Sequence, residues 1–448
     1  MAAERDKLNP IARFNTIGQN IGMTQKLFAQ ASIAAFLLFA SIATAQNASW
    51  PQWRGANQDD HSPDTGLLKK WPSEGPKLLW VYKDAGFGYS GFSVVGTGLF
   101  TMGTRGEDLV VIAVNTNDGT EIWSTKIGID DAQPYNAGWG NGPRGTPTYA
   151  DGRVYALGPK GVLACLDARS GRIEWKKDLM KDFSGQAGNW GFAESPLVSD
   201  GMVIVGPGGK EAGIVALDAK TGRTKWKADD VKPGKAEYAT AIKATLHGKP
   251  QFIRFFEKTV YGVDAKNGDV LWQGEWPRGR TAVIPTPIVD GNRIYISSGY
   301  KAGSKLFEVT DDWSVKTLWD DEKVMVNHHG GVILKDGHLY GYSDSRAAKG
   351  LVCQNLETGK KVWSENGDGF GKGAVTLADG QLYCVNESDG LVSLVEATTS
   401  GFKMNGQFKL SPQSDNRHIK GKIWTHPVVI GGKLYLRDQE LVHCYQVR

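Results

Sequence analysis

The chain has 448 residues, with 52 Lys and Arg against 48 Asp and Glu, and it contains 57 Gly and 15 Trp. The nearly balanced charge forms neither a basic stripe nor an acidic tail, which argues against nucleic acid and against a strongly charged partner. Many glycines and large aromatic residues suit a protein with many turns and tightly packed sheets.

The first 45 residues form a predicted secretory signal peptide. Residues 31–43 are almost wholly apolar, Lys26 precedes them, and Ala43-Thr44-Ala45 supplies the small residues of a cleavage site. A transmembrane helix needs about 20 apolar residues, more than this stretch offers. Residues 1–22 do not fit a signal, so Met23 is an alternative start, and no cysteine follows for a lipid anchor. We therefore expect a soluble protein, exported to the periplasm or the extracellular space.

Beyond an expected extension over residues 46–75, the block Asp-x-x-x-Gly-x-x-x-Trp recurs along the chain. Its clearest copy runs from Asp218 through Gly222 to Trp226. The Asp side chain bonds the backbone of the turn, and the glycine takes the positive φ that closes a short hairpin. Successive aromatic positions lie between 43 (80 to 123) and 52 (123 to 175) residues apart, a period typical of propeller blades. These positions are Trp80, Trp123, Trp175, Trp226, Trp272, Trp319, Trp363 and Phe408.

Each repeat predicts four short strands, because a turn and alternating apolar residues, as in 151–157, precede each block. The last unit starts at Trp424 and ends at Arg448 without an outer-strand aromatic residue of its own. The segment 76–83 has the opposite pattern, an outer strand with no inner strands before it. We therefore predict an all-β, eight-bladed propeller of four-stranded antiparallel blades over residues 76–448, closed by its N-terminal outer strand.

The pattern from Ala216 to Trp226 resembles the tryptophan-docking repeat of PQQ-like, or quinoprotein-type, β-propellers. The resemblance implies that each Trp wedges between adjacent blades. The segments 50–55, 189–196, 327–331 and 424–427 look like a bacterial, exported subgroup of that family without a defined activity. The resemblance covers roughly residues 50–448 through repeated copies of the motif.

Four cysteines are expected to fill buried strands as small apolar side chains. Cys165, Cys353 and Cys444 occupy equivalent positions in three repeats, and Cys384 lies in a second strand. A Cys353–Cys384 disulfide is the alternative. Cys-x-x-Cys spacing of the metal-binding type is absent from the sequence.

Candidate site residues stand just before the first strand of each blade, which lines the central channel of a propeller. Polar side chains from eight successive blades should converge at one mouth and form a site for an anionic or hydroxylated ligand. The alternative is a water-lined mouth in which Arg144 pairs with Glu194 of the neighbouring blade. The candidates are Tyr89, Arg144, Glu194, Tyr238, Arg280, His328, His329, Lys372 and His426.

No metal site is predicted at this mouth. In a strand, His328 and His329 would point to opposite faces and could not chelate one ion together. One of them with His426 would find a third ligand only in Glu194. Two loop residues, Trp139 and Trp190, could cover the mouth, but packing is the favoured interpretation for each.

Three functions remain open from the sequence. We expect a monomeric binding or scaffold protein for an unknown protein or small-molecule partner, similar to the scaffold of the outer-membrane barrel-insertion machinery. The resemblance also allows a PQQ- and calcium-dependent dehydrogenase of alcohols or sugars. The sequence lacks three features expected of such a dehydrogenase: an adjacent Cys-Cys pair, a second carboxylate beside Glu194 among the mouth candidates, and a Cys-x-x-Cys-His haem site. Glycan or polymer binding on Trp and Tyr side chains is the third possibility.

Overall fold

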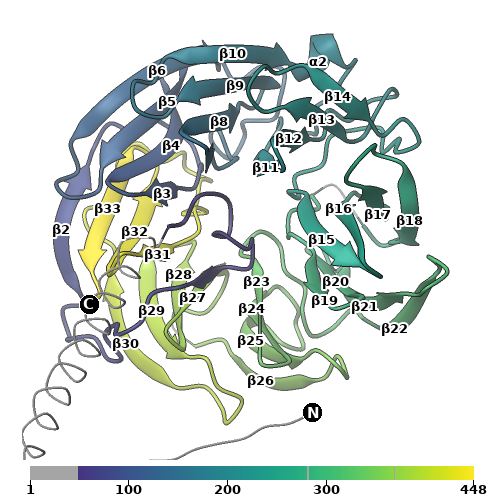
Figure 1. Cartoon of the computed structure of the whole chain (residues 1–448). Helices are drawn as coiled ribbons and strands as arrows, with labels where there is room; N and C mark the ends of the chain where they lie inside the picture. Colours follow the sequence, from purple (N-terminus) through teal and green to yellow (C-terminus); the bar gives the residue numbers. More distant parts are fainter. Residues whose placement is uncertain (1–48, 280–281, 368) are drawn as a thin grey trace, which may run out of the picture. The chain divides into compact units, whose positions relative to one another are not determined.

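The computed structural model describes residues 49–279, 282–367 and 369–448. The predicted signal peptide and Arg280 therefore lie outside the described residues. The described chain belongs to one compact unit and is built almost entirely of β-strands, which form eight sheets around a central axis (Figure 1). None of its described helices has the length and apolar character needed to cross a membrane.

Each blade is a four-stranded antiparallel sheet, and the first strand of each lies nearest the axis. Blade 1 contains β3 (Ser93–Val95), β4 (Gly98–Arg105), β5 (Asp108–Asn115) and β6 (Glu121–Ile129). Blade 2 contains β7 (Thr148–Ala150), β8 (Arg153–Leu157), β9 (Val162–Asp167) and β10 (Ile173–Asp178), and α2 (Leu179–Asp182) follows it. Blade 3 contains β11 (Leu197–Ser199), β12 (Met202–Val205), β13 (Val215–Asp218) and β14 (Thr224–Lys227).

The next three blades repeat this order. Blade 4 contains β15 (Ile242–Leu246), β16 (Lys249–Phe255), β17 (Thr259–Asp264) and β18 (Val270–Glu275). Blade 5 contains β19 (Ile288–Asp290), β20 (Arg293–Ser298), β21 (Gly303–Val309) and β22 (Val315–Asp321). Blade 6 contains β23 (Val332–Lys335), β24 (His338–Ser343), β25 (Gly350–Asn355) and β26 (Lys361–Glu365).

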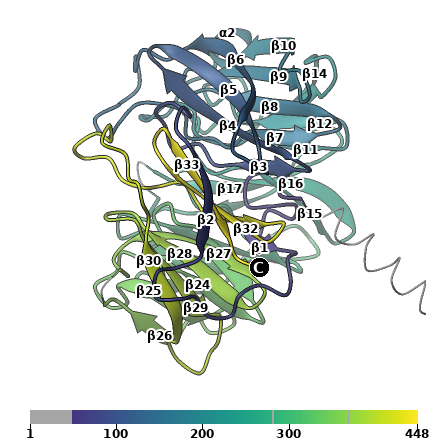
Figure 2. The ribbon, with the colours of Figure 1, turned by 90° about the vertical axis from the view of Figure 1, so that its left-hand side faces the viewer.

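The last blade joins the two ends of the ring. Blade 7 contains β27 (Gly373–Ala378), β28 (Gln381–Asn386), β29 (Leu391–Glu396) and β30 (Met404–Lys409). Blade 8 contains β31 (Val428–Ile430), β32 (Lys433–Asp438) and β33 (Leu441–Gln446), and its outer strand is β2 (Lys77–Tyr82). Figure 2 shows β2 alongside β33, where Trp80 lies opposite Cys444. The prediction of eight blades closed by the N-terminal outer strand is confirmed.

Outer-strand indoles bond to the backbone of the following blade. Nε1 of Trp123 donates to Ala168 O at 3.0 Å, and Nε1 of Trp175 donates to Ala219 O at 3.0 Å. Because these carbonyls lie in the next sheet, each bond links two blades. The same kind of bond runs from Trp80 to Thr116 O, from Trp319 to Leu356 O and from Trp363 to Thr398 O.

Two indoles depart from this pattern. Trp272 donates to the side chain of Gln251 within its own blade, and the buried Nε1 of Trp226 has no hydrogen-bond partner among the described residues. Blade 5 follows Trp272, and its stretch 310–314 lacks the turn glycine of the other copies. The indole therefore meets no turn of the usual shape there.

The repeated glycine has a steric role as well as a conformational one. In blade 3, Asp218 Oδ1 accepts a bond from the backbone N of Thr221 at 2.9 Å, and Gly222 follows at φ 69°. A Cβ atom on Gly222 would lie 2.9 Å from the indole ring of Trp175. Only glycine therefore satisfies both the left-handed backbone and the close approach of the neighbouring blade.

All four cysteines are buried and unpaired. The interpretation of these residues as apolar fillers in strands is confirmed, and the alternative Cys353–Cys384 disulfide is wrong. Burial raises the pKa of the Cys165 thiol to about 12, so this thiol stays protonated at neutral pH.

The N-terminal residues 49–62 cross the centre of the ring (Figure 1). Their contacts reach the inner edges of five blades, so the segment fills part of the central channel. Arg54 and Asp60 form an ion pair within it at 3.1 Å, with side chains 2% and 1% exposed. The contacts are Trp50 with Val94, Pro51 O with Tyr149 N, Arg54 with Val332 O, Gln58 with Ala241 O, Asp60 O with Leu377 N, and β1 (His61–Ser62) in parallel with β27.

Replacing Gly222 by Ala should destabilise the ring. Gly201 is the matched control, because it lies in the same blade at φ 70° but a Cβ atom there meets nothing within 4 Å. Gly201→Ala should cost about 1–2 kcal/mol through the left-handed backbone alone. Gly222→Ala should cost about 1–3 kcal/mol more through overpacking against Trp175. Urea denaturation midpoints would measure the difference, and equal losses would show that the indole contact is not tight.

Candidate functional site

A cavity of about 310 Å³ opens at one end of the channel. Most of its lining residues follow the fourth strand of a blade, and a few follow the second strand. The second and fourth strands of an antiparallel blade run in the same direction, so the connections that leave them open on the same face. One face of the ring therefore gathers side chains from successive blades.

The structure brings seven of the nine predicted residues together. These seven residues lie in six connections between blades, and the connections converge as expected. Arg280 lies outside the described residues, and Glu194 does not line the cavity. The seven are Tyr89, Arg144, Tyr238, His328, His329, Lys372 and His426.

The expectation that Glu194 stands at the mouth, where Arg144 could pair with it, is wrong. Glu194 is buried and forms an ion pair with Arg254 Nη1, while its Oε1 accepts a bond from Gly206 N at 2.6 Å. Arg254 comes from the end of β16, the second strand of blade 4. Only residues just before the first strand of each blade were considered from the sequence. Burial raises the pKa of Glu194, and the charge of Arg254 opposes this effect.

Arg144 lines the cavity without a carboxylate partner in the described part of the chain. Its Nη1 donates to Gly142 O and its Nη2 to Gly140 O, each at 3.1 Å. The guanidinium lies 5.5 Å from the ring centre of Tyr89 and 5.7 Å from that of Tyr135. Burial lowers the pKa of Arg144, but a guanidinium stays charged in proteins. The carbonyls and rings therefore hold in place a cation that has no carboxylate within ion-pair distance among the described residues, and Asp130 acts on it only at longer range.

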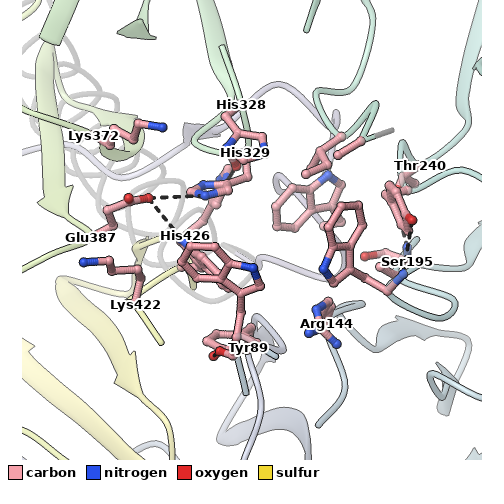
Figure 3. Close-up of a pocket in the computed structure, with 18 of the residues that line it drawn as sticks. Tyr89, Arg144, Ser195, Thr240, His328, His329, Lys372, Glu387, Lys422 and His426 are labelled. Atoms are coloured by element: carbon pink, nitrogen blue, oxygen red, sulfur yellow. Dashed lines mark hydrogen bonds and ion pairs between the residues drawn. The ribbon is translucent and has the colours of Figure 1, made fainter. Parts of the chain in front are cut away.

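Glu387, which was not identified from the sequence, lines the cavity from the connection between β28 and β29. Its Oε2 accepts a bond from Trp424 Nε1 at 2.9 Å, and His329 Nε2 lies 3.2 Å from the same oxygen (Figure 3). Burial raises the pKa of Glu387, and the Trp424 donor opposes the rise. Connections that follow second strands lie on the same face of the ring as those that precede first strands. The sequence pattern after each second strand could therefore have indicated this carboxylate.

The expectation that His328 and His329 point to opposite faces held only for a strand, and this condition is not met. Both lie in a loop rather than a strand, and their rings stack with centres 4.6 Å apart. His426 Nε2 lies 2.7 Å from His329 O, which can only accept, so this nitrogen carries the hydrogen. Burial lowers the pKa of His328 and of His426 to about 4 and that of His329 well below its usual range. The three imidazoles are therefore uncharged at neutral pH.

Four indoles form much of the cavity wall. Trp139 and Trp190 line the cavity and also pack, Trp139 against Trp424 and Trp190 against Tyr238; Trp139 is 42% exposed. Trp424 lies between them and the histidines, with ring centres 6.2 Å from Trp139 and 5.1 Å from His329. Trp53 comes from the channel segment, and its ring centre lies 4.5 Å from that of His426. Residues 49–62 thus contribute to the site as well as to the ring.

The described lining carries more positive than negative charge. Arg144, Lys372 and Lys422 line the cavity with Glu387 as the carboxylate among them. Lys372 is paired with Asp344 at 2.7 Å. Within the described ranges, no three His, Cys, Asp or Glu side chains come together as a group that could hold a metal ion. The cavity is suited to an anion with an apolar face.

A family model described as outer membrane protein assembly factor BamB matches residues 107–365 and 312–401, which together exceed half of the chain. The chain belongs to this family of PQQ-like β-propellers. The predicted family resemblance is confirmed.

Relatives in this family have different names. Quinohemoprotein alcohol dehydrogenase ADH-IIG of Pseudomonas putida is 27% identical over 268 residues, which are 54% of this chain and 33% of the relative. Outer membrane protein assembly factor BamB of Yersinia pestis is 23% identical over 341 residues, which are 72% of this chain and 76% of the relative. The match thus spans about a third of the dehydrogenase and three quarters of BamB.

Solved structures share the propeller fold. BamB from Moraxella catarrhalis superposes with a TM-score of 0.56 at 16% identity, over 83% of this chain and 97% of that one. Quinohemoprotein alcohol dehydrogenase ADHIIG from Pseudomonas putida HK5 gives 0.60 at 14% identity, over 91% and 81%. At these identities the likeness concerns the fold alone.

Glu237, next to the cavity residue Tyr238, provides a test of the buried charges beneath the site. Burial, and then the charge of Glu257, raises the pKa of Glu237 from its ordinary 4.5 to about 8. Between these pH values the unfolded chain has lost the proton while the folded protein keeps it, so rising pH removes stability. Glu237→Gln, which cannot ionise, should therefore match the natural protein at pH 4.5.

The stability advantage of Glu237→Gln should grow up to about pH 8 and then level off. A tenfold change in proton affinity corresponds to about 1.4 kcal/mol. Thermal denaturation at pH 5, 6.5 and 8 would measure the trend. Glu357→Gln, at a side chain 72% exposed, is the control without a trend. A constant difference at all pH values would contradict the burial of a titrating Glu237.

Proposed function

We propose that the protein is an exported binding protein that holds a small anionic ligand, with a ring that stacks on indoles, at the mouth of its channel. The unpaired guanidinium of Arg144 carries this proposal. A half-buried cation without a counter-charge is costly, and a bound carboxylate or phosphate would relieve that cost. The bonds to Gly140 O and Gly142 O use only some of its five N–H donors.

The geometry around Arg144 favours a ligand over solvent alone. Two aromatic rings and two carbonyls hold the guanidinium in one orientation, so little conformational entropy remains to be lost on binding. Lys422 adds a second cation that has no carboxylate within ion-pair distance in the described ranges, although its charge acts on Glu387. The indoles of Trp53, Trp139, Trp190 and Trp424 supply flat apolar surfaces for a ring.

Export and ring architecture complete the proposal. The predicted signal peptide over residues 1–45 supports export to the periplasm or beyond, as do relatives named for outer-membrane assembly. The bonds from outer-strand indoles to the next blade support the role of these residues as docking groups between blades. The rigid ring would also suit a scaffold that binds a protein partner through its loops.

The dehydrogenase alternative requires that the cavity fit a quinone together with calcium. Calcium takes six to eight oxygen ligands, often several carboxylates. Among the described lining residues the carboxylate is Glu387, and its Oε2 already accepts from Trp424 Nε1. The indoles and cations suit a flat polyanion, but the oxygen donors do not fit the calcium ion. We therefore place no oxidation step at this site.

Arg144→Ala should weaken an anionic ring ligand selectively. The probes are 2-naphthoate and its uncharged analogue 2-naphthamide, followed by isothermal titration calorimetry. Loss of a charged hydrogen-bond partner costs about 1.5–3 kcal/mol, so the naphthoate affinity should fall at least about tenfold while the naphthamide affinity changes little.

The control for this experiment is Arg172→Ala, at a side chain 74% exposed and outside the cavity, which should leave both affinities unchanged. Naphthoate binding that survives in Arg144→Ala would refute the anion site. Failure of naphthoate to bind the natural protein at all would argue against the proposed ligand class.

The second prediction for this site concerns chemistry. Natural protein supplied with PQQ and calcium should show no dye-linked oxidation of alcohols or sugars, because Glu387 is the one carboxylate among the described lining residues and calcium usually takes several. Dye reduction that depends on both additions, and that Glu387→Gln abolishes, would establish the dehydrogenase function instead.

A further inference from the structure

We infer that the ring-shaped anion is a sugar acid, a hexuronate or a short oligosaccharide that presents one. Arg144 would bind the carboxylate, and Glu387 would accept bonds from ring hydroxyls. This inference rests on the proposed function and identifies the class of its ligand.

Glu387 has one free acceptor facing the cavity. Its Oε2 accepts from Trp424 Nε1 and lies 3.2 Å from His329 Nε2, whereas no described residue donates to Oε1. Oε1 is not among the enclosed side-chain atoms that lack a partner, and Glu387 lines the cavity. A carboxylate oxygen is therefore presented to whatever occupies the site.

A carboxylate opposes the binding of a purely anionic ligand, so Glu387 needs another explanation. Lys372 pairs with Asp344. Lys372 and Lys422 therefore act on Glu387 only at longer range. The Trp424 N–H opposes the rise in the Glu387 pKa that burial causes, and it fixes the orientation of the carboxylate. Since a carboxylate can only accept, the matching ligand carries O–H or N–H donors as well as a negative charge.

The two polar ends of the cavity lie apart. Figure 3 shows Glu387 and Arg144 on opposite sides of the labelled site, with indole rings between them. Trp424 connects the two sides, because its Nε1 bonds to Glu387 and its ring centre lies 4.8 Å from that of Tyr89, beside Arg144. A ligand that fits has a carboxylate at one end, hydroxyls at the other and an apolar face between them.

A pyranose ring with a carboxylate meets these three demands. Its C–H face stacks on an indole, its carboxylate pairs with a guanidinium and its hydroxyls donate to a carboxylate. The Tyr238 hydroxyl accepts from Trp190 N at 3.3 Å, so its own hydrogen is free for a sugar oxygen. A flat aromatic acid satisfies Arg144 and the indoles but brings no donor to Glu387.

The test compares D-glucuronate, D-glucose and 2-naphthoate by isothermal titration calorimetry. The natural protein should bind D-glucuronate at least about tenfold more tightly than D-glucose. Glu387→Gln keeps the size of the side chain but loses the charged acceptor, so it should weaken D-glucuronate about tenfold or more and leave 2-naphthoate unchanged. Arg144→Ala should weaken both acids.

Glu357→Gln, at an exposed carboxylate outside the cavity, is the matched control and should change none of the affinities. Unchanged 2-naphthoate binding shows that Glu387→Gln preserves the indole walls and the fold. If 2-naphthoate binds through Arg144 but D-glucuronate does not, or if Glu387→Gln weakens both acids equally, the sugar-acid inference is refuted while the proposed function stands. If neither acid binds, the proposed function itself fails.

Discussion

The ring depends on one repeated contact, the outer-strand indole of one blade against the turn glycine of the next. Trp175 over Gly222 shows why the contact constrains the chain so strongly. The glycine closes its hairpin at φ 69° and leaves room for an indole that a Cβ atom would approach to 2.9 Å. A blade alone could bury only one face, whereas eight blades in series bury both faces of each sheet. Pairing of β2 with β33 then removes the last unmatched junction.

The closed ring surrounds a central channel, and residues 49–62 fill part of it. Their buried Arg54–Asp60 pair and their bonds to inner strands anchor the segment within the channel. Burial raises the pKa of Asp60 to about 6, which marks a carboxyl far from solvent. The segment turns a channel into a pocket, and it places Trp53 against His426 at the site. The same residues therefore serve the architecture and the cavity.

The polar groups of the cavity differ in charge and in how far their hydrogen-bonding capacity is used. Burial lowers the pKa of the imidazoles of His328, His329 and His426, so at neutral pH they provide hydrogen bonds and ring surfaces but no charge. Arg144 keeps its charge without a partner, and Glu387 keeps one free oxygen. Relatives named as an assembly factor and as dehydrogenases share this propeller.

The amino-acid sequence determined the fold, because the Asp–Gly–Trp block encodes a local turn and a neighbour contact that repeat with a fixed period. It also indicated the mouth residues that precede inner strands, since blade geometry sends those positions to one face. It could not show that Glu194 pairs with Arg254, that His328 and His329 stack in a loop, or that Glu387 and Trp53 join the site. Those partners lie far apart in the chain, and only the closed ring decides which side chains meet.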